Sequence, residues 1–102
     1  MARLFAVIRS RGPAWENARR MEDQQDRHAH ATFMNMLYAE GSCLLVGPLE
    51  ETSDVLMIAS ADSAEQINAR LADDPWSDNG LLRTRLVAPW TLRLGSPAAA
   101  PR

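Results

Sequence analysis

The chain has 102 residues, of which 46% are hydrophobic and 24% charged, a length and composition that favour one folded domain over a disordered segment. Eleven basic residues, all arginine, and thirteen acidic residues give a net charge of −2. Because both signs are mixed along the sequence, a basic stripe for nucleic acid is excluded.

The cysteine content and the apolar runs narrow the class of protein further. Cys43 is the single cysteine, so it has no partner for an internal disulfide, which fits a reducing cytoplasm. Residues 4–8 form too short an apolar run for a signal peptide, and no run approaches the ~18 residues of a membrane span. We therefore expect a cytoplasmic protein without a membrane partner.

The first part of the sequence predicts a strand and a helix. The strand covers residues 4–8 and gives way to Gly12 and Pro13. Residues 22–40 contain no glycine or proline and are followed by Gly41, which predicts a helix with a glycine stop. Apolar residues at three- and four-residue steps predict its buried stripe: Ala29, Phe33, Met36, Leu37 and Tyr38.

The middle of the sequence predicts a pair of strands and the start of a second helix. Residues 43–46 and 55–59 are short apolar runs joined by an acidic linker, which is typical of a hairpin-like pair. Ser63 and Gln66 have the spacing of a capping box at the start of a helix, with Asp62 and Glu65 as a competing frame.

The last part of the sequence predicts the end of this helix and one more strand. The helix ends near Asp73, because Pro75 disfavours helical backbone at the residue before it. After a turn, residues 83–90 form the last strand. We expect one domain over residues 1–95 and a flexible tail over residues 96–102.

The order β-α-β-β-α-β predicts an α+β, ferredoxin-like subunit with a four-stranded antiparallel sheet and both helices on one face. The strand runs are apolar on both faces, although the helices cover only one. A bare apolar face of that size is unusual in a monomer. We therefore expect a face-to-face homodimer, a dimeric α/β-barrel whose interior between the two sheets holds the site.

Several motifs occur in a recognisable order along almost the whole chain. They are RGPAW at 11–15, HATFM at 30–34, the stretch from Glu40-Gly41 to Gly47-Pro48-Leu49, DVLMI at 54–58, ADDPW at 72–76 and PWT at 89–91. In these motifs the chain resembles the YCII-related family. The resemblance implies a dimeric α/β-barrel akin to muconolactone isomerase. It also implies a catalytic pair of one histidine on the first helix and one aspartate before a proline, which match His30 and Asp74.

The two residues suit proton transfer on general chemical grounds as well. Histidine as a residue type can give or take a proton near neutral pH, and a carboxylate such as Asp74 beside it would fix the tautomer of His30 and stabilise the imidazolium. The alternative is structural: His30 would be a partly buried helix residue and Asp74 a turn former.

Aromatic and basic residues are the candidates for binding a ligand. Trp76, two residues after Asp74, and Trp15 are expected to border a pocket for a planar molecule, although packing is the alternative for both. Trp90 is assigned to packing. An arginine in the pocket, with Arg27, Arg83 and Arg85 as candidates, would hold a carboxylate or phenolate, and solvated surface arginine is the alternative.

Metal and cofactor sites are not expected. His28 and His30 point roughly 200° apart on a helix, so they do not share one ion. The glycines match no nucleotide-binding fingerprint. Cys43 lies in an apolar strand, where a thiol is inert.

The resemblance implies a cofactor-independent enzyme, an isomerase or a lyase of the dehydrochlorinase type, acting on a small aromatic-derived molecule. His30 would be the general acid–base and Asp74 its partner. The alternatives are a non-catalytic dimer that binds a small molecule and a cofactor-free oxygenase, the latter on fold analogy alone.

Overall fold

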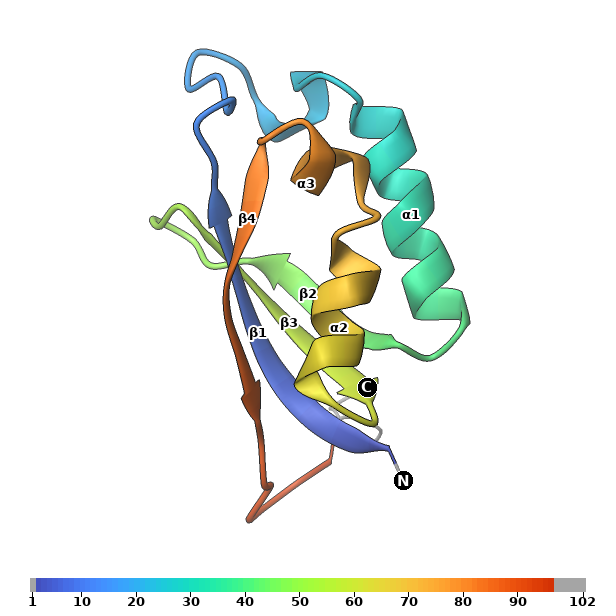
Figure 1. Cartoon of the computed structure of the whole chain (residues 1–102). Coiled ribbons are helices and arrows are strands. Elements are labelled where there is room, and N and C mark those ends of the chain that lie inside the picture. Colours follow the sequence, from blue (N-terminus) through green and yellow to red (C-terminus); the bar gives the residue numbers. More distant parts are fainter. Residues whose placement is uncertain (1, 97–102) are drawn as a thin grey trace.

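The computed structural model describes residues 2–96 (Figure 1). Over this range the chain forms an antiparallel sheet of four strands and three α-helices. The elements in chain order are β1 (Arg3–Arg11), a short 3₁₀ helix (Met21–Asp23), α1 (Arg27–Ala39), β2 (Cys43–Pro48), β3 (Asp54–Ala61), α2 (Ala64–Leu71), α3 (Pro75–Asp78) and β4 (Leu82–Pro89).

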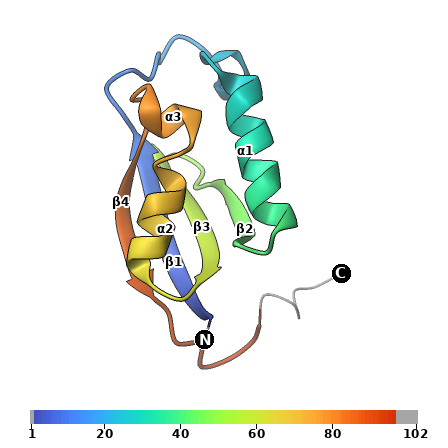
Figure 2. The same cartoon turned by 45° about the vertical axis from the view of Figure 1, so that its right-hand side comes forward.

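The sheet has the strand order β2-β3-β1-β4, so the first strand lies in the centre beside β3 and β4. Val7 on β1 is paired with Met57 on β3 and with Val87 on β4. All three α-helices lie on one face of this sheet, as two views of the ribbon show (Figures 1 and 2). The arrangement confirms the predicted α+β class and is consistent with a ferredoxin-like subunit.

The main hydrophobic core lies between the sheet and the helices. Side chains alternate between the faces of a strand, so Phe5 and Val7 on β1 both point to the helix side. There they meet the apolar stripes of α1 and α2, and both are almost completely buried. The core consists of Phe5, Val7, Phe33, Leu37, Cys43, Met57, Ala59, Ile67 and Leu71.

The central strand is longer than the sequence predicts. We expected it over residues 4–8, whereas β1 continues to Arg11. Arg9 is therefore the third side chain on the helix side after Phe5 and Val7, and it is only 2% exposed. The strand stops before Gly12, whose N–H donates to the carbonyl oxygen of Leu81.

The first long helix begins five residues later than predicted. Asp26 has a left-handed backbone with φ of 59°, so it cannot continue a helix from residue 22, and α1 starts at Arg27. The predicted stripe is right for Phe33 and Leu37 and wrong for three other residues. Those three, Ala29, Met36 and Tyr38, are exposed. The buried stripe instead includes the partly buried His30 and Met34, which lie three residues before Phe33 and Leu37, respectively.

The start of α2 is as predicted, but the segment after it is not a simple turn. Ser63 Oγ accepts a hydrogen bond from the N–H of Gln66 at 3.2 Å. The helix ends at Leu71, and Pro75 then opens α3 instead of only ending α2. Proline suits the first position of a helix because its fixed φ matches and no N–H is needed there.

The sheet face without helices carries apolar side chains. Ile8 on β1 is paired with Leu56 on β3 and with Leu86 on β4, so the three share this face. Leu45 on β2 and Leu86 are 50% and 48% exposed. Among the described residues no helix is long and apolar enough to cross a membrane. Of the predicted tail, residues 97–102 lie outside the described part of the chain.

Candidate functional site

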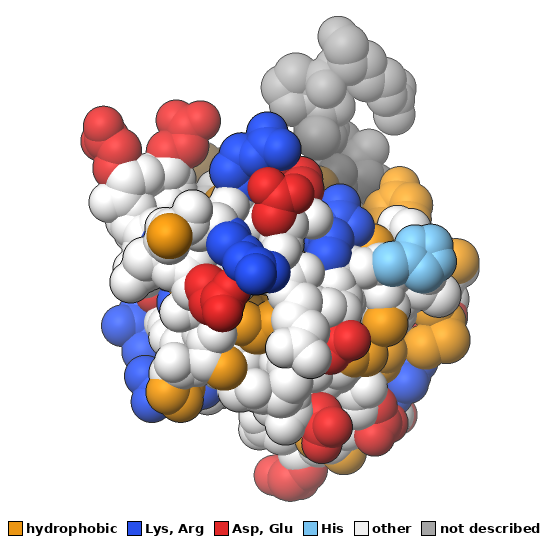
Figure 3. Space-filling model, turned by 90° about the horizontal axis from the view of Figure 1, so that it is seen from above, with side chains coloured by type: hydrophobic (Ala, Val, Ile, Leu, Met, Phe, Trp, Pro, Cys, Tyr) orange, Lys and Arg blue, Asp and Glu red, His pale blue; other side chains and the backbone are white. Residues whose placement is uncertain are grey.

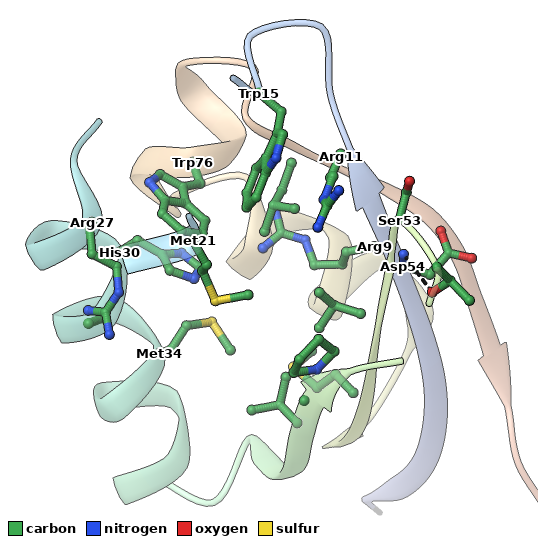
Figure 4. A pocket seen from close by; sticks show the side chains of 18 of the residues that line it. Arg9, Arg11, Trp15, Met21, Arg27, His30, Met34, Ser53, Asp54 and Trp76 are labelled. Atoms are coloured by element: carbon green, nitrogen blue, oxygen red, sulfur yellow. Dashed lines mark hydrogen bonds between the residues drawn. The ribbon is translucent and has the colours of Figure 1, made fainter. Parts of the chain in front are cut away.

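A cavity of about 350 Å³ lies between α1, α3 and the ends of β1, β2 and β3. Its ionisable lining residues are Arg9, Arg11, Arg27, His30 and Asp54, and its large apolar ones include Trp15, Met21, Met34, Met57 and Trp76 (Figure 4). Seen from the end that carries α3, the surface shows acidic and basic groups intermixed rather than one charged patch (Figure 3).

His30 and Asp74 lie within hydrogen-bonding distance of each other, although 44 residues separate them in the sequence. Nδ1 of His30 is 2.9 Å and 3.0 Å from the two carboxylate oxygens of Asp74. An ionised carboxylate only accepts hydrogen bonds, so Nδ1 carries the proton. Nε2 forms no hydrogen bond within residues 2–96 and is the ring nitrogen left for a ligand in the cavity.

Asp74 is completely buried and holds several donors at once. Its carboxylate accepts hydrogen bonds from His30, from Arg9 at 2.7 Å and from the N–H of Trp76 at 3.0 Å. The last of these bonds caps the N-terminus of α3. Burial raises the pKa of Asp74, but the bonds from His30, Arg9 and Trp76 outweigh it, so the pKa lies below its ordinary value. Asp74 is therefore a buried anion beside the imidazole.

Arg9 is a site residue that the sequence analysis missed. It donates from one terminal nitrogen to Asp74 and from the other to Ser77 Oγ. Its Nε is buried without a hydrogen-bond partner in the described part of the chain. The signal was present in the alternation of Phe5, Val7 and Arg9, which places the arginine on the core face. A charged residue directly after an apolar run was instead read as the end of the strand.

The two tryptophans predicted to border the pocket both line the cavity. Trp76 is almost fully buried, and its ring stacks on that of His30 with centroids 3.8 Å apart and 5° between the planes. Its Nε1 donates to the carbonyl oxygen of Gln25 at 2.7 Å. Trp15 meets Trp76 edge-on at 5.7 Å and is partly buried. Trp76 thus contacts the candidate acid–base group itself, whereas Trp15 forms part of the wall.

The other arginine candidates lie in different places. Arg27 lines the cavity, whereas Arg83 and Arg85 are exposed on β4 and do not. Arg85 donates instead to the carboxylate of Asp54 at 2.9 Å.

Three further residues lie outside the cavity. His28 is exposed, and Cys43 is buried in the core, where burial raises the pKa of its thiol. Trp90, assigned to packing, is 45% exposed in the single chain.

The location of the site corrects one expectation from the sequence. We expected the site between the two sheets of a dimer, on the face without helices. Arg9 shares the helix face with Phe5 and Val7, and it bonds Asp74, so the pair lies on the opposite side of the sheet. The histidine comes from α1 and the aspartate from the N-cap of α3, both on the face that the helices cover.

The fold and the site define a ferredoxin-like α+β domain with a histidine–aspartate pair between its first long helix and its sheet. A family model for the YCII-related domain matches residues 4–91, and the chain belongs to this family. None of the curated proteins compared with the chain matches it. The family match agrees with the resemblance found in the motifs, including the segments that contain His30 and Asp74.

Proposed function

We propose that the protein is a cofactor-independent enzyme that transfers protons on a small, aromatic-derived molecule. The observation that carries the proposal is the hydrogen bond between His30 and Asp74 beside a cavity of about 350 Å³. The volume falls in the range of small-molecule sites, and the lining combines apolar side chains with five ionisable ones. The reaction class is an isomerisation, or a lyase step that expels a leaving group such as chloride.

In this mechanism Nε2 of His30 is the atom that takes the proton from the substrate. With Nδ1 already protonated and bound to Asp74, the neutral ring has its lone pair on Nε2. Taking a proton there makes the imidazolium, and the neighbouring negative charge of Asp74 stabilises it. The same nitrogen then returns the proton to another atom in an isomerisation, or keeps it until the leaving group has departed. Arg9 and the N–H of Trp76 hold the carboxylate in place.

A matched pair of histidine variants tests this role. Candidate ring-cleavage lactones and chlorinated hydroxyquinones are incubated in D₂O, and turnover and deuterium incorporation are followed by absorbance and NMR. General acid–base groups contribute about 10²–10⁴-fold, so His30→Gln should lose that much of the rate. His28→Gln, a change on the same helix at an exposed position, should keep it. Equal rates for His30→Gln and the unchanged protein would remove His30 from the mechanism. No turnover of any candidate by the unchanged protein would favour a non-catalytic ligand-binding protein.

We also propose that two copies of the chain associate through the sheet faces that carry no helices. The support is the row of apolar side chains on that face, with Leu45 and Leu86 about half exposed in the single chain. Burying them against a second copy removes apolar area from water at about 25 cal/mol per Å². Because the cavity lies on the other face, this contact stabilises the fold without completing the site.

A further inference from the structure

The charges around the cavity do not balance. Of the ionisable groups that line it, Arg9 is paired with the buried Asp74, and Asp54 accepts hydrogen bonds from Ser10 and Arg85. The guanidinium groups of Arg11 and Arg27 form no ion pair with a carboxylate in the described part of the chain. The cavity therefore has two cations in its wall that no protein anion neutralises, and an anionic ligand would do so.

Arg27 stands where its own helix disfavours a cation. It is the first residue of α1, whose first turn contains no acidic residue. The N-terminus of a helix carries partial positive charge and stabilises anions, so a guanidinium there gains nothing from the helix. Arg27 is also partly buried at the cavity wall instead of extended into solvent. An anion bound in the cavity would therefore be attracted by the charge of Arg27.

Arg11 and Arg9 approach the same space from the central strand. Figure 4 shows both side chains reaching from β1 toward the tryptophans and His30. The guanidinium carbon of Arg11 is 4.7 Å from the centre of the Trp15 ring, so the cation packs on the face of the indole. This contact does not use the N–H groups of Arg11, which can donate to a ligand. The Nε of Arg9 is a buried donor without a partner among residues 2–96, so Asp74 and Ser77 leave one N–H of this guanidinium unpaired.

The rest of the wall suits an apolar body. Trp15, Met21, Met34 and Met57 all line the cavity. Such side chains bury apolar surface, and methionines adapt to irregular or planar groups. From these contacts we infer that the cavity binds a small monocarboxylate with an apolar or aromatic body. Its carboxylate is held by Arg11 on the β1 side, and the charge of Arg27 on the α1 side adds to the attraction for an anion. The inference deepens the proposed function, since it names the chemical class of the substrate.

Binding of benzoate, measured by NMR titration of the backbone amides, tests the inference without turnover. Benzyl alcohol is the neutral probe of similar shape. Benzoate should bind more tightly than benzyl alcohol and shift the amides of cavity residues. Arg11→Gln should weaken benzoate binding by about fivefold or more, since it removes a charge-assisted contact. Arg27→Gln should weaken it less, because that charge attracts the anion without contacting it. Arg3→Gln removes the same charge at the exposed far end of β1 and should leave the affinity unchanged.

Three results would overturn the inference: equal affinity for benzoate and benzyl alcohol, no benzoate shift at cavity residues, or the same weakening by Arg3→Gln as by the cavity variants. Inorganic phosphate is titrated in parallel, and tighter binding of phosphate than of benzoate would contradict a carboxylate with an apolar body. His30→Gln separates this inference from the proposed mechanism. That variant should keep its preference for benzoate over benzyl alcohol even where proton transfer is lost, because both arginines are unchanged.

Discussion

The imidazole ring of His30 lies parallel to the indole ring of Trp76, 3.8 Å from it between centroids. Asp74, two residues before Trp76, binds the edge of the same imidazole through Nδ1. Thus the face and one edge of the histidine are both held by residues at the start of α3. Pro75 lies between them and fixes the first turn of this short helix. The orientation of Nε2 depends on three consecutive residues that lie far from His30 in sequence.

Replacing Asp74 with asparagine should make the stability of the protein less sensitive to acid. The pKa of Asp74 is lower in the folded protein than in the unfolded chain, so its ionised form stabilises the fold. This stabilisation is fully present above the ordinary carboxyl pKa of about 4 and is lost as the pH falls through the lower folded-state value. Urea unfolding measured across this range should show the free energy of unfolding of the unchanged protein falling toward that of Asp74→Asn as the pH decreases.

Asp73→Asn is the matched control, since Asp73 is the exposed neighbour of Asp74. The free energy of unfolding of Asp73→Asn should equal that of the unchanged protein at every pH. A difference in unfolding free energy between the unchanged protein and Asp74→Asn that stays constant from neutral to acid pH would show that the ionised form of Asp74 contributes nothing.

Replacing Arg9 with methionine should destabilise the protein strongly. Methionine keeps much of the length of the side chain but leaves the carboxylate of Asp74 buried without its 2.7 Å partner. Removing one member of a buried ion pair costs about 3–5 kcal/mol. Arg3→Met, at an exposed position on the same strand, should change the unfolding free energy by no more than about 0.5 kcal/mol. Similar unfolding midpoints in urea for the two variants would contradict the importance of the Arg9–Asp74 pair.

The burial of Arg9 is a feature that local sequence patterns could not predict. The glycine after α1 and the Ser63 cap of α2 act within a few residues, so the order of elements and the fold class could be predicted. The burial of Arg9 depends on Asp74, 65 residues further along the chain. A pattern of neighbouring residues in the sequence does not identify a partner at that separation. His30 and Asp74 were predicted because their family motifs are recognisable, whereas the side of the sheet on which they meet follows from tertiary packing.

Replacing Gly12 with alanine should disturb the segment between β1 and β4. A Cβ at position 12 would lie 2.2 Å from the carbonyl oxygen of Gly80, a backbone atom that cannot rotate away. Overpacking of this kind costs about 1–3 kcal/mol, which thermal unfolding would measure. Gly47→Ala is the control, since no atom lies within 4 Å of its Cβ position. Equal melting temperatures for the two variants would show that the Gly12–Gly80 contact is not tight.

Replacing Leu86 with glutamate should separate the proposed dimer into single chains. Leu86 and Leu45 lie on the two outer strands of the face without helices, and each is about half exposed. A carboxylate buried at their contact with a second copy would lose its hydration without gaining a partner. Sedimentation equilibrium should therefore give the mass of two chains for the unchanged protein and of one chain for Leu86→Glu.

The control for this experiment is Tyr38→Glu, which places the same charge at a 67% exposed position on α1. It should leave the mass at two chains, because α1 lies on the other side of the sheet. Leu86→Glu should also keep its benzoate binding, since the cavity is formed by one chain. A well-folded unchanged protein that sediments as a single chain would contradict the dimer, and the apolar face would then need another explanation than a second copy.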